Sequence, residues 1–273
     1  MSVWRDIADR VTGPLMDALL PQTCCSCERW IPAGTSSLCD DCRTALEATA
    51  SISYCPFCGR TVSPLSIHEK NCSLCDTERF WNVRGIVRAG EYREEALRRL
   101  LLGLKFAGHD RQADLLGQLL VAALRSAPWF AEIDVLVPVP MHRLRRWQRP
   151  CDHALVLAES AGRLLSLPVR RAAIRRVKYA RSQIKTLSRA ERFRNVKDCF
   201  GPASRANVAG KTICIVDNLL VTGATIHEIS KVLRQSGAKR IYAAVAARSS
   251  LPGDIHASSA VLDGAGIAQG GDG

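Results

Sequence analysis

Four runs of apolar residues predict β-strands in the last two thirds of the chain. They cover residues 83–89, 134–140, 213–216 and 241–248. The run at 213–216 is nearly continuous in β-forming apolar side chains, which suits a strand buried on both faces of a parallel sheet. The run at 134–140, DVLVPVP, predicts a second buried strand that ends in a proline-punctuated turn.

Segments with helical spacing lie between these strands. From residue 226 to 233 apolar side chains recur with the period of a helix, and Gly237 ends the run. Further helices are expected over residues 91–106, 114–124 and 153–165. Helices that alternate with buried strands predict an α/β fold, a parallel sheet with helices on both faces. Residues 175–200 have no clean period and predict a long loop with a short helix, as in lids and binding loops.

The two ends of the chain differ in composition from this central part. Residues 1–20 predict an amphipathic helix with Val3, Trp4, Ile7 and Val11 on one face, and residues 251–273, rich in Gly, Ala and Ser, predict a flexible tail. We place a small cysteine-rich domain at 21–80 and the α/β domain at 81–250. No apolar run reaches the length of a membrane span, and the N-terminus lacks the apolar core of a signal peptide. A cytoplasmic location without membrane insertion is therefore expected.

Charge is concentrated in one part of the chain. The formal net charge is +12, and residues 141–200 hold sixteen Lys and Arg against four Asp and Glu, an excess as large as that of the whole chain. A region of this kind favours polyanions, either nucleic acid or a substrate that carries a diphosphate. It is also compatible with a solvated basic face.

The twelve cysteines change the picture of the N-terminal third. Eight of them form four C-x-x-C pairs: Cys24/Cys27, Cys39/Cys42, Cys55/Cys58 and Cys72/Cys75. Thiolate pairs at this spacing hold tetrahedral Zn²⁺, and in reducing cytosol such cysteines bind metal more often than they form disulfides. Two sites of four protein ligands are closed, so we expect two structural ions whose binding supplies the folding energy of this domain.

Spacing alone leaves the grouping of the cysteine pairs open. Grouping in chain order joins the first two pairs around one ion and the last two around the other, whereas a cross-brace would interleave them. Cys25 is a spare or alternative ligand, and Cys151, Cys199 and Cys214 are interpreted as isolated core or surface residues.

The segment ICIVDNLLVTGAT, from Ile213 to Thr225, carries the candidate ligand chemistry. It predicts a strand, an acidic turn, and then a loop of small residues that opens a helix. Free backbone N–H groups and the positive end of a helix favour an anion at such a loop, and Thr222 and Thr225 add hydroxyl donors. An ordinary strand–turn–helix connection is the alternative.

This segment resembles the phosphoribosyl-diphosphate (PRPP) motif of type I phosphoribosyltransferases. The resemblance implies that Thr222, Gly223, Ala224 and Thr225 cradle the 5′-phosphate of PRPP. It places Asp217 and Asn218 at the two acidic positions that hold the ribose hydroxyls, the catalytic pair, although the second is not acidic here. Mg²⁺ is expected with PRPP if the protein is active.

The order of parts along the chain is similar to the ComF family of competence-associated proteins, in which a zinc ribbon segment precedes a type I phosphoribosyltransferase-like domain. The phrases that carry this resemblance are LPQTCCSC (20–27), GLKFAG (103–108), VPVPMHRLRRWQR (137–149), and L-S-x-x-E-R-x-x-N-V (187–196). The resemblance covers the chain up to about Arg248. It implies a diphosphate site at the arginine-rich turn after Pro140, where Arg143, Arg145 and Arg146 make charge-assisted hydrogen bonds.

Several positions depart from the family pattern. Residues 149–154 are RPCDHA where the family has Arg-Gly-Phe-Asn-Gln-Ala, Val221 and Ala180 replace threonines, and Asn218 replaces an aspartate. Two functions therefore stay open. One is a protein that binds PRPP or a related phosphorylated ribose, with or without transferase activity, in the uptake of DNA during competence. The other is a non-catalytic component that binds single-stranded DNA or DNA-uptake proteins, with Trp147, Tyr179 and Phe193 available to stack on bases.

Overall fold

The structure is a computed structural model, and it describes the cysteine-rich region and the α/β region with several gaps. The described residues are 22–32, 37–63, 67–68, 71–72, 75, 82–106, 110–141, 151–178, 188–203 and 207–249. The predicted N-terminal helix and C-terminal tail lie outside these residues. None of the helices in the described parts is both long and apolar enough to cross a bilayer.

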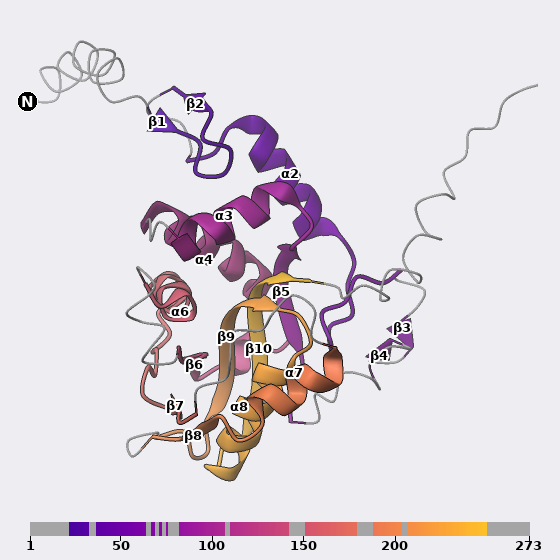
Figure 1. Cartoon of the computed structure of the whole chain (residues 1–273), viewed down its shortest axis with the longest axis vertical. Helices are drawn as coiled ribbons and strands as arrows, with labels where there is room; N and C mark the ends of the chain where they lie inside the picture. The colour runs from indigo at the N-terminus through magenta and orange to yellow at the C-terminus, as the bar shows by residue number, and fades with distance from the viewer. Residues whose placement is uncertain are drawn as a thin grey trace, which may run out of the picture.

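A four-stranded parallel sheet forms the centre of the α/β region (Figure 1). Its strands, in spatial order, are β5 (Ile86–Glu91), β10 (Arg240–Arg248), β9 (Thr212–Leu220) and β6 (Val135–Pro138). All neighbours are parallel, with Ile86 beside Ala243, Leu220 beside Arg248 and Val135 beside Ile213. The carboxyl ends of the strands therefore meet at one edge, where ligands bind in open α/β sheets.

Helices cover both faces of the sheet, as the sequence pattern predicts. One hydrophobic cluster joins α3 (Glu95–Phe106), α4 (Asp110–Arg125) and α6 (His153–Leu165) to one face. A second cluster joins α8 (Ala224–Gln235) to the other face. Residues alternate between the clusters along β9, with Ile213 and Ile215 in the second and Cys214 and Val216 in the first. Continuous burial explains why this strand has no polar alternation.

The strand β9 is longer than its sequence pattern predicts. We expected a turn at Asp217, but the strand runs on through Asp217 and Asn218 to Leu220. The reason is its pairing with β10, which continues from Val245 opposite Asp217 to Arg248 opposite Leu220. Backbone pairing with a neighbouring strand outweighs the low strand propensity of Asp and Asn here.

The basic segment after α6 contains more structure than expected. The predicted short helix is α7 (Arg189–Val196), which begins with a capping box between Ser188 and Glu191. On either side of it, β7 (Ile174–Arg176) and β8 (Phe200–Pro202) pair antiparallel, a pairing that the sequence pattern did not predict. Each strand has only three residues, which is too short to show a period.

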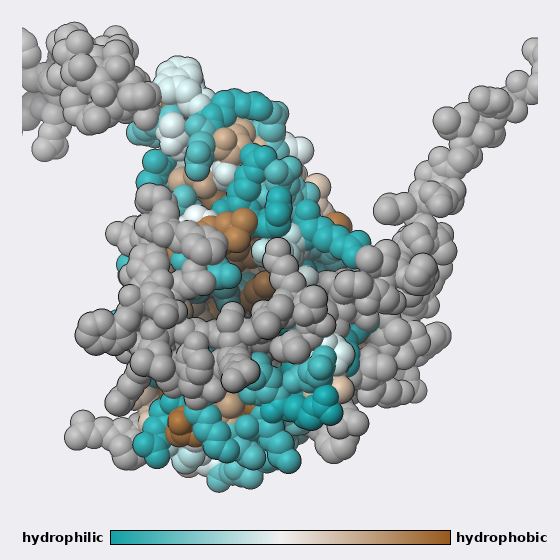
Figure 2. Space-filling model, viewed as in Figure 1, coloured by the Kyte–Doolittle hydropathy of each residue, from teal (hydrophilic) through white to brown (hydrophobic). Residues whose placement is uncertain are grey.

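The cysteine-rich region consists of small elements around turns. Two strand pairs, β1 (Gln22–Thr23) with β2 (Trp30–Ile31) and β3 (Ile67–His68) with β4 (Asn71–Cys72), are antiparallel. Between these two pairs, α2 (Asp40–Ser51) packs against β5 of the sheet. Outside this region, a 3₁₀ turn (Phe130–Glu132) precedes β6. On the face seen in Figure 2, hydrophilic residues cover most of the described surface and hydrophobic residues gather in the middle.

Candidate metal centres and phosphate-binding site

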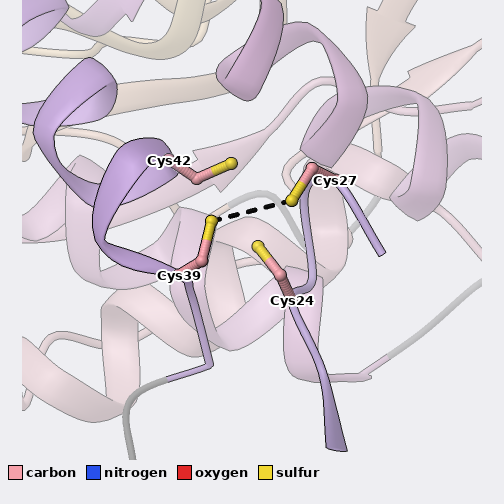
Figure 3. Close-up of side chains that lie close together, drawn as sticks. All are labelled: Cys24, Cys27, Cys39 and Cys42. Atoms are coloured by element: carbon pink, nitrogen blue, oxygen red, sulfur yellow. Dashed lines mark hydrogen bonds between the residues drawn. The ribbon is translucent and has the colours of Figure 1, made fainter. Parts of the chain in front are cut away.

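The first four cysteines of the C-x-x-C pairs lie together. The Sγ atoms of Cys24, Cys27, Cys39 and Cys42 all lie within 4.8 Å of one another, and those of Cys27 and Cys39 are 3.6 Å apart. Figure 3 shows the four side chains pointing toward a common centre. Cys24 and Cys27 come from the turn after β1, whereas Cys39 caps α2 and Cys42 lies in its first turn. The start of α2 thus brings two of the four sulfur atoms to the common centre.

The second four cysteines form an equivalent group that is more deeply buried. The Sγ atoms of Cys55, Cys58, Cys72 and Cys75 also lie within 4.8 Å of one another. The Sγ–Sγ distances are 3.5 Å for Cys55–Cys75, 3.7 Å for Cys58–Cys72 and 3.6 Å for Cys72–Cys75. In both groups the pairs are joined in chain order, and the interleaved cross-brace that spacing left open is not formed.

Both groups fit a zinc ion. A tetrahedral site with Zn–S bonds of about 2.3 Å has S–S edges of about 3.8 Å, close to the distances in both groups. Burial raises the pKa of the Cys42 thiol to about 12, so this thiol holds its proton at neutral pH until a cation displaces it. Four protein ligands leave no open coordination position, so these are structural zinc sites.

The two zinc-binding turns repeat the same backbone pattern. The Cys24 N–H donates to Arg29 O at 2.8 Å, and the Glu28 N–H donates to Cys24 O at 2.9 Å. The Cys55 N–H donates to Arg60 O and the Gly59 N–H to Cys55 O, both at 2.8 Å. The fifth residue of each turn is left-handed, with φ +62° at Glu28 and +72° at Gly59. Glycine takes this conformation without cost, whereas glutamate is strained in it.

A phosphate-sized cavity lies where β9 leads into α8. Its volume is about 40 Å³, and it is lined by Asp217 and by residues 219–226. Gly223 caps α8 with φ +78°, a left-handed conformation that turns the chain sharply into the helix. The first N–H groups of α8 have no carbonyl partner within the helix, because a helix leaves its first four donors unpaired. The four TGAT residues thus surround a site suited to an anion.

The hydroxyl of Thr222 also takes part in the hydrogen bonding of the loop. Thr222 is buried, and its Oγ1 accepts a hydrogen bond from the Ala224 N–H at 3.4 Å. The hydroxyl therefore stabilises the loop itself, although its proton stays available to an anion. Thr225 is half-buried and lines the cavity.

Asp217 brings a carboxylate to the same cavity. Its Oδ1 accepts a hydrogen bond from the Asn218 N–H at 2.8 Å. Burial, with a smaller contribution from the nearby carboxylate of Asp152, raises the pKa of Asp217 to about 7 against the lowering effects of the Asn218 N–H and the guanidinium of Arg176. Asp217 is thus shared between its acidic and ionised forms at neutral pH. The Asn218 side chain is half-buried beside it.

Sequence reasoning missed Asp152 and Arg176 as neighbours of Asp217. Asp152 is the N-cap of α6, where its side chain accepts from the Leu155 N–H at 3.4 Å. Arg176 ends β7, with its guanidinium 5.3 Å from the centre of the Phe200 ring. Asp152 and Arg176 are distant from Asp217 in the sequence, and only the topology of the fold brings them close to it. The departure RPCDHA already marked Asp152 as unusual, but no pattern in the sequence marks Arg176.

Other candidate residues are placed elsewhere or not described. Arg143, Arg145 and Arg146, together with Trp147 and Tyr179, lie outside the described residues. Phe193 packs edge-on against His227, with ring centroids 5.6 Å apart, so it contacts α8. Cys214 and Cys199 are buried core residues, as interpreted from the sequence, and Cys25 is not among the eight clustered cysteines.

Comparisons with known proteins agree with this organisation. A family model described as "Double zinc ribbon domain" matches residues 15–78. Competence protein F of Haemophilus influenzae is 29% identical over 223 residues, which cover 80% of this chain and 93% of that protein. The DNA utilization protein YhgH of Escherichia coli K12 is 26% identical over 81% of this chain and 95% of its own length.

Part of the chain is also similar to enzymes named for phosphoribosyl chemistry. Amidophosphoribosyltransferase of Escherichia coli K12 is 31% identical over 116 residues, 42% of this chain and 20% of that enzyme. The solved structure of the glutamine PRPP amidotransferase of B. subtilis, complexed with ADP and GMP, has 24% identity and a TM-score of 0.33 over 48% of this chain and 25% of that one. The chain spans a quarter or less of the length of these two enzymes. The chain is a homologue of competence protein F, with a double zinc ribbon ahead of a parallel α/β domain, and part of its sequence is similar to amidophosphoribosyltransferase.

Proposed function

We propose that this protein binds PRPP or a related phosphorylated ribose at the carboxyl end of β9, and that it does so as part of DNA uptake or utilisation. The proposal rests on the presence of two kinds of ligand-binding group at one cavity. The TGAT loop offers helix N–H groups to a phosphate, and Asp217 offers a carboxylate to the sugar. The names of the relatives, competence protein F and DNA utilization protein YhgH, supply the biological setting.

In this proposal each group has a separate task. The 5′-phosphate takes the cavity beside Thr222, Gly223, Ala224 and Thr225, whose volume of about 40 Å³ admits one compact anion. Asp217 accepts hydrogen bonds from the ribose 2′- and 3′-hydroxyls. Arg143, Arg145 and Arg146 would bind the diphosphate through charge-assisted hydrogen bonds. Mg²⁺ bound to the diphosphate would neutralise part of its charge.

If transfer occurs, its chemistry requires little from the protein beyond charge and position. Loss of diphosphate from C1 of the ribose leaves a cation, which the ionised Asp217 stabilises electrostatically before a nucleophile attacks the same carbon. Asn218 hydrogen-bonds a hydroxyl but carries no charge. Replacing a charge-assisted hydrogen bond by a neutral one costs about 1.5–3 kcal/mol, roughly 10–100-fold in binding or rate. Binding is thus better supported than fast turnover.

Calorimetric titration with Mg²⁺-PRPP tests the proposal in four full-length proteins. Wild type should release or absorb heat with a one-site isotherm, and Asn218→Asp should bind about 10–100-fold tighter because it regains a charged acceptor. Thr225→Val keeps the shape of the side chain but removes the hydroxyl, and should weaken binding about tenfold or more. Thr44→Val, at an exposed position of α2, is the matched control. Absence of heat in both wild type and Asn218→Asp would sink the proposal.

The second candidate function, a non-catalytic component that binds single-stranded DNA, is favoured by an exposed aromatic side chain on the first zinc ribbon. Trp30 is 57% exposed and lines a hollow of about 420 Å³ with Arg29 and Arg43. The two arginines pair with Asp41 and Asp40 respectively, so this hollow is neutral by itself. Base stacking on Trp30 would supply affinity there, and the basic region 141–200 would supply the salt dependence.

Fluorescence anisotropy with labelled single-stranded DNA separates this second function from the first. Affinity should fall steeply with salt in wild type, and Trp30→Ala should weaken binding by about 1–3 kcal/mol if a base stacks there. The control is Ile52→Ala, another exposed apolar position that lies outside the Trp30 hollow. Affinity that is absent at low salt, or insensitive to salt, contradicts a DNA-binding role.

A further inference from the structure

The second zinc site packs against the strand that leads into the TGAT loop. Its four cysteines, 0–5% exposed, share one hydrophobic cluster with Leu220 of β9 and Ile226 of α8. The first zinc site is placed differently. Its buried members, Cys24 and Cys42, belong to the other cluster, together with Leu97 and Leu104 of α3. The second site thus shares a cluster with Leu220, the last residue of β9, whereas the preceding Leu219 packs against the cluster that holds the first site.

The contact runs through the backbone of the zinc-binding turn. A Cβ atom placed on Gly59 would lie 3.5 Å from Cγ2 of Ile86 and 3.7 Å from Cδ2 of Leu220, so the turn lies directly on these two side chains. The Ile86 N–H donates to Pro56 O, inside the same turn, at 2.7 Å. The Cys55–Cys58 turn is thus bonded to β5 and packed on β9.

A buried ion pair fixes the same ribbon to the sheet. Arg88 of β5, 2% exposed, donates from Nη1 to Glu91 Oε1 and from Nη2 to Thr61 Oγ1, both at 2.7 Å. Its guanidinium lies 4.9 Å from the centre of the Tyr54 ring. Tyr54 and Thr61 form the β-bridge that closes the zinc-binding turn. A charged group that is buried in this way is held to one geometry by its partners, so the turn has a fixed seat on the sheet.

Leu220 connects this seat to the ligand cavity. It contacts the turn on one side and lines the TGAT cavity on the other, and its C=O accepts from the Ser249 N–H at 2.8 Å. The next residues in the chain are Val221 to Thr225, the loop itself. An element that holds Leu220 therefore sets where this loop begins.

We propose that the second zinc site is a positioning element for the TGAT loop, acting through Gly59 and Leu220. Zinc bound by Cys55, Cys58, Cys72 and Cys75 fixes the turn, the turn holds Leu220, and Leu220 holds the loop in its anion-binding form. Loss of zinc from the second site loosens the loop, whereas loss from the first site leaves it in place. The inference deepens the proposed function, because it gives the ribbon a task at the proposed ligand site.

Hydrogen exchange on full-length protein without ligand tests the coupling, with the zinc content of each protein counted by mass spectrometry. Cys72→Ser removes a ligand of the second site, and Cys24→Ser, also at a buried cysteine, removes one of the first site. Cys72→Ser should speed exchange in residues 219–226 by about tenfold or more, because local opening of this unit becomes easier. Cys24→Ser should leave these residues within about twofold of wild type. Equal exchange of residues 219–226 in the two variants overturns the proposal.

Leu220→Ala provides the test that keeps all eight cysteines. It should retain two zinc ions, and exchange should rise both in residues 221–226 and in the turn 55–60, because each side loses its contact with the other. A rise confined to the loop, with the turn unchanged, would show that Leu220 does not transmit between them and would overturn the proposal even if Cys72→Ser fails to fold.

The same variants separate this inference from the proposed function. Exchange is measured without PRPP, so the coupling stands or falls independently of the ligand. If the coupling is present but wild type gives no heat with Mg²⁺-PRPP, the positioning role holds and the ligand assignment fails. If wild type binds Mg²⁺-PRPP, and Cys72→Ser binds it equally well with unchanged exchange, the ligand assignment holds and the positioning role fails.

Discussion

Replacing Asp217 by Asn should stabilise the protein and remove its ligand binding at the same time. The Asp217 carboxylate lies at the edge of the cavity. Its pKa is raised to about 7, and burial is the main cause. In the unfolded chain the same group has a pKa of about 3.9. Ionised Asp217 therefore costs folding free energy at neutral pH, and a residue that costs stability in a binding site is expected where function requires it.

The size of the effect follows from the shift. About three pKa units at 1.36 kcal/mol each set an upper limit of about 4 kcal/mol for the penalty at pH 8. Asp217 is only half-buried, so part of its surface is in contact with solvent. Screening by this solvent reduces the penalty to about 2 kcal/mol. Because the folded-state pKa lies above the unfolded one, wild type loses this stability as pH rises from about 4 to 7, and the penalty is constant above that.

Urea unfolding of wild type and Asp217→Asn between pH 5 and 8.5 measures the difference. The variant should gain about 1 kcal/mol at pH 5 and about 2 kcal/mol at pH 8. Both proteins contain the same zinc sites, so the pH dependence of the metal cancels in the difference. Asp198→Asn is the matched control, since its side chain is 56% exposed and its ion pair with Lys231 is long, at 4.0 Å. It should stay within about 0.5 kcal/mol of wild type at every pH.

Two results would refute this reasoning. A difference between wild type and Asp217→Asn that does not change with pH would show that Asp217 has an ordinary pKa in the folded protein. Undiminished binding of Mg²⁺-PRPP by the stabilised variant would show that the carboxylate has no part in the site.

Three further outcomes are expected. Full-length protein should contain two zinc ions per chain by elemental analysis, and a strong chelator should unfold the cysteine-rich region first, seen as proteolysis before residue 82; a count of one contradicts the two groups. Glu28→Gly should stabilise the protein by up to about 1 kcal/mol in urea unfolding, and Gly59→Ala should destabilise it by about 1–2 kcal/mol, because both positions are left-handed; effects of the same sign would contradict the shared turn geometry. Asn218→Asp should lower the free energy of unfolding at pH 8 by about 1 kcal/mol, since it places a second carboxylate beside Asp217, and an unchanged value would count against a poorly solvated site.

The parts of the fold that sequence pattern predicts are those with a strong local signal. The helix α6 begins and ends where predicted, at His153 and Leu165, because Asp152 caps it and its apolar period is regular. The cysteines could be assigned to zinc because their spacing is itself the geometry of a metal-binding turn. The buried strands could be predicted because short continuous apolar runs are typical of strands that are covered on both faces of a parallel sheet.

The parts that sequence pattern missed depend on neighbours that are distant in the chain. The extension of β9 through Asp217 and Asn218 follows from pairing with β10, which overrides the polar character of both residues. Arg176 and Asp152 approach Asp217 only because β7 and α6 are brought to the same edge of the sheet. The contact between the Gly59 turn of the second zinc site and Leu220 has no signal in the sequence, since glycine is common in turns and leucine in strands.

The central claim is that the cavity between β9 and α8 holds the phosphate of a phosphorylated ribose, and hydrogen exchange with and without saturating Mg²⁺-PRPP tests it most directly. The predicted result is slower exchange in residues 217–226 of wild type, and stronger slowing in Asn218→Asp. Unchanged exchange in these residues in both proteins, or slowing found only elsewhere in the chain, would contradict the claim.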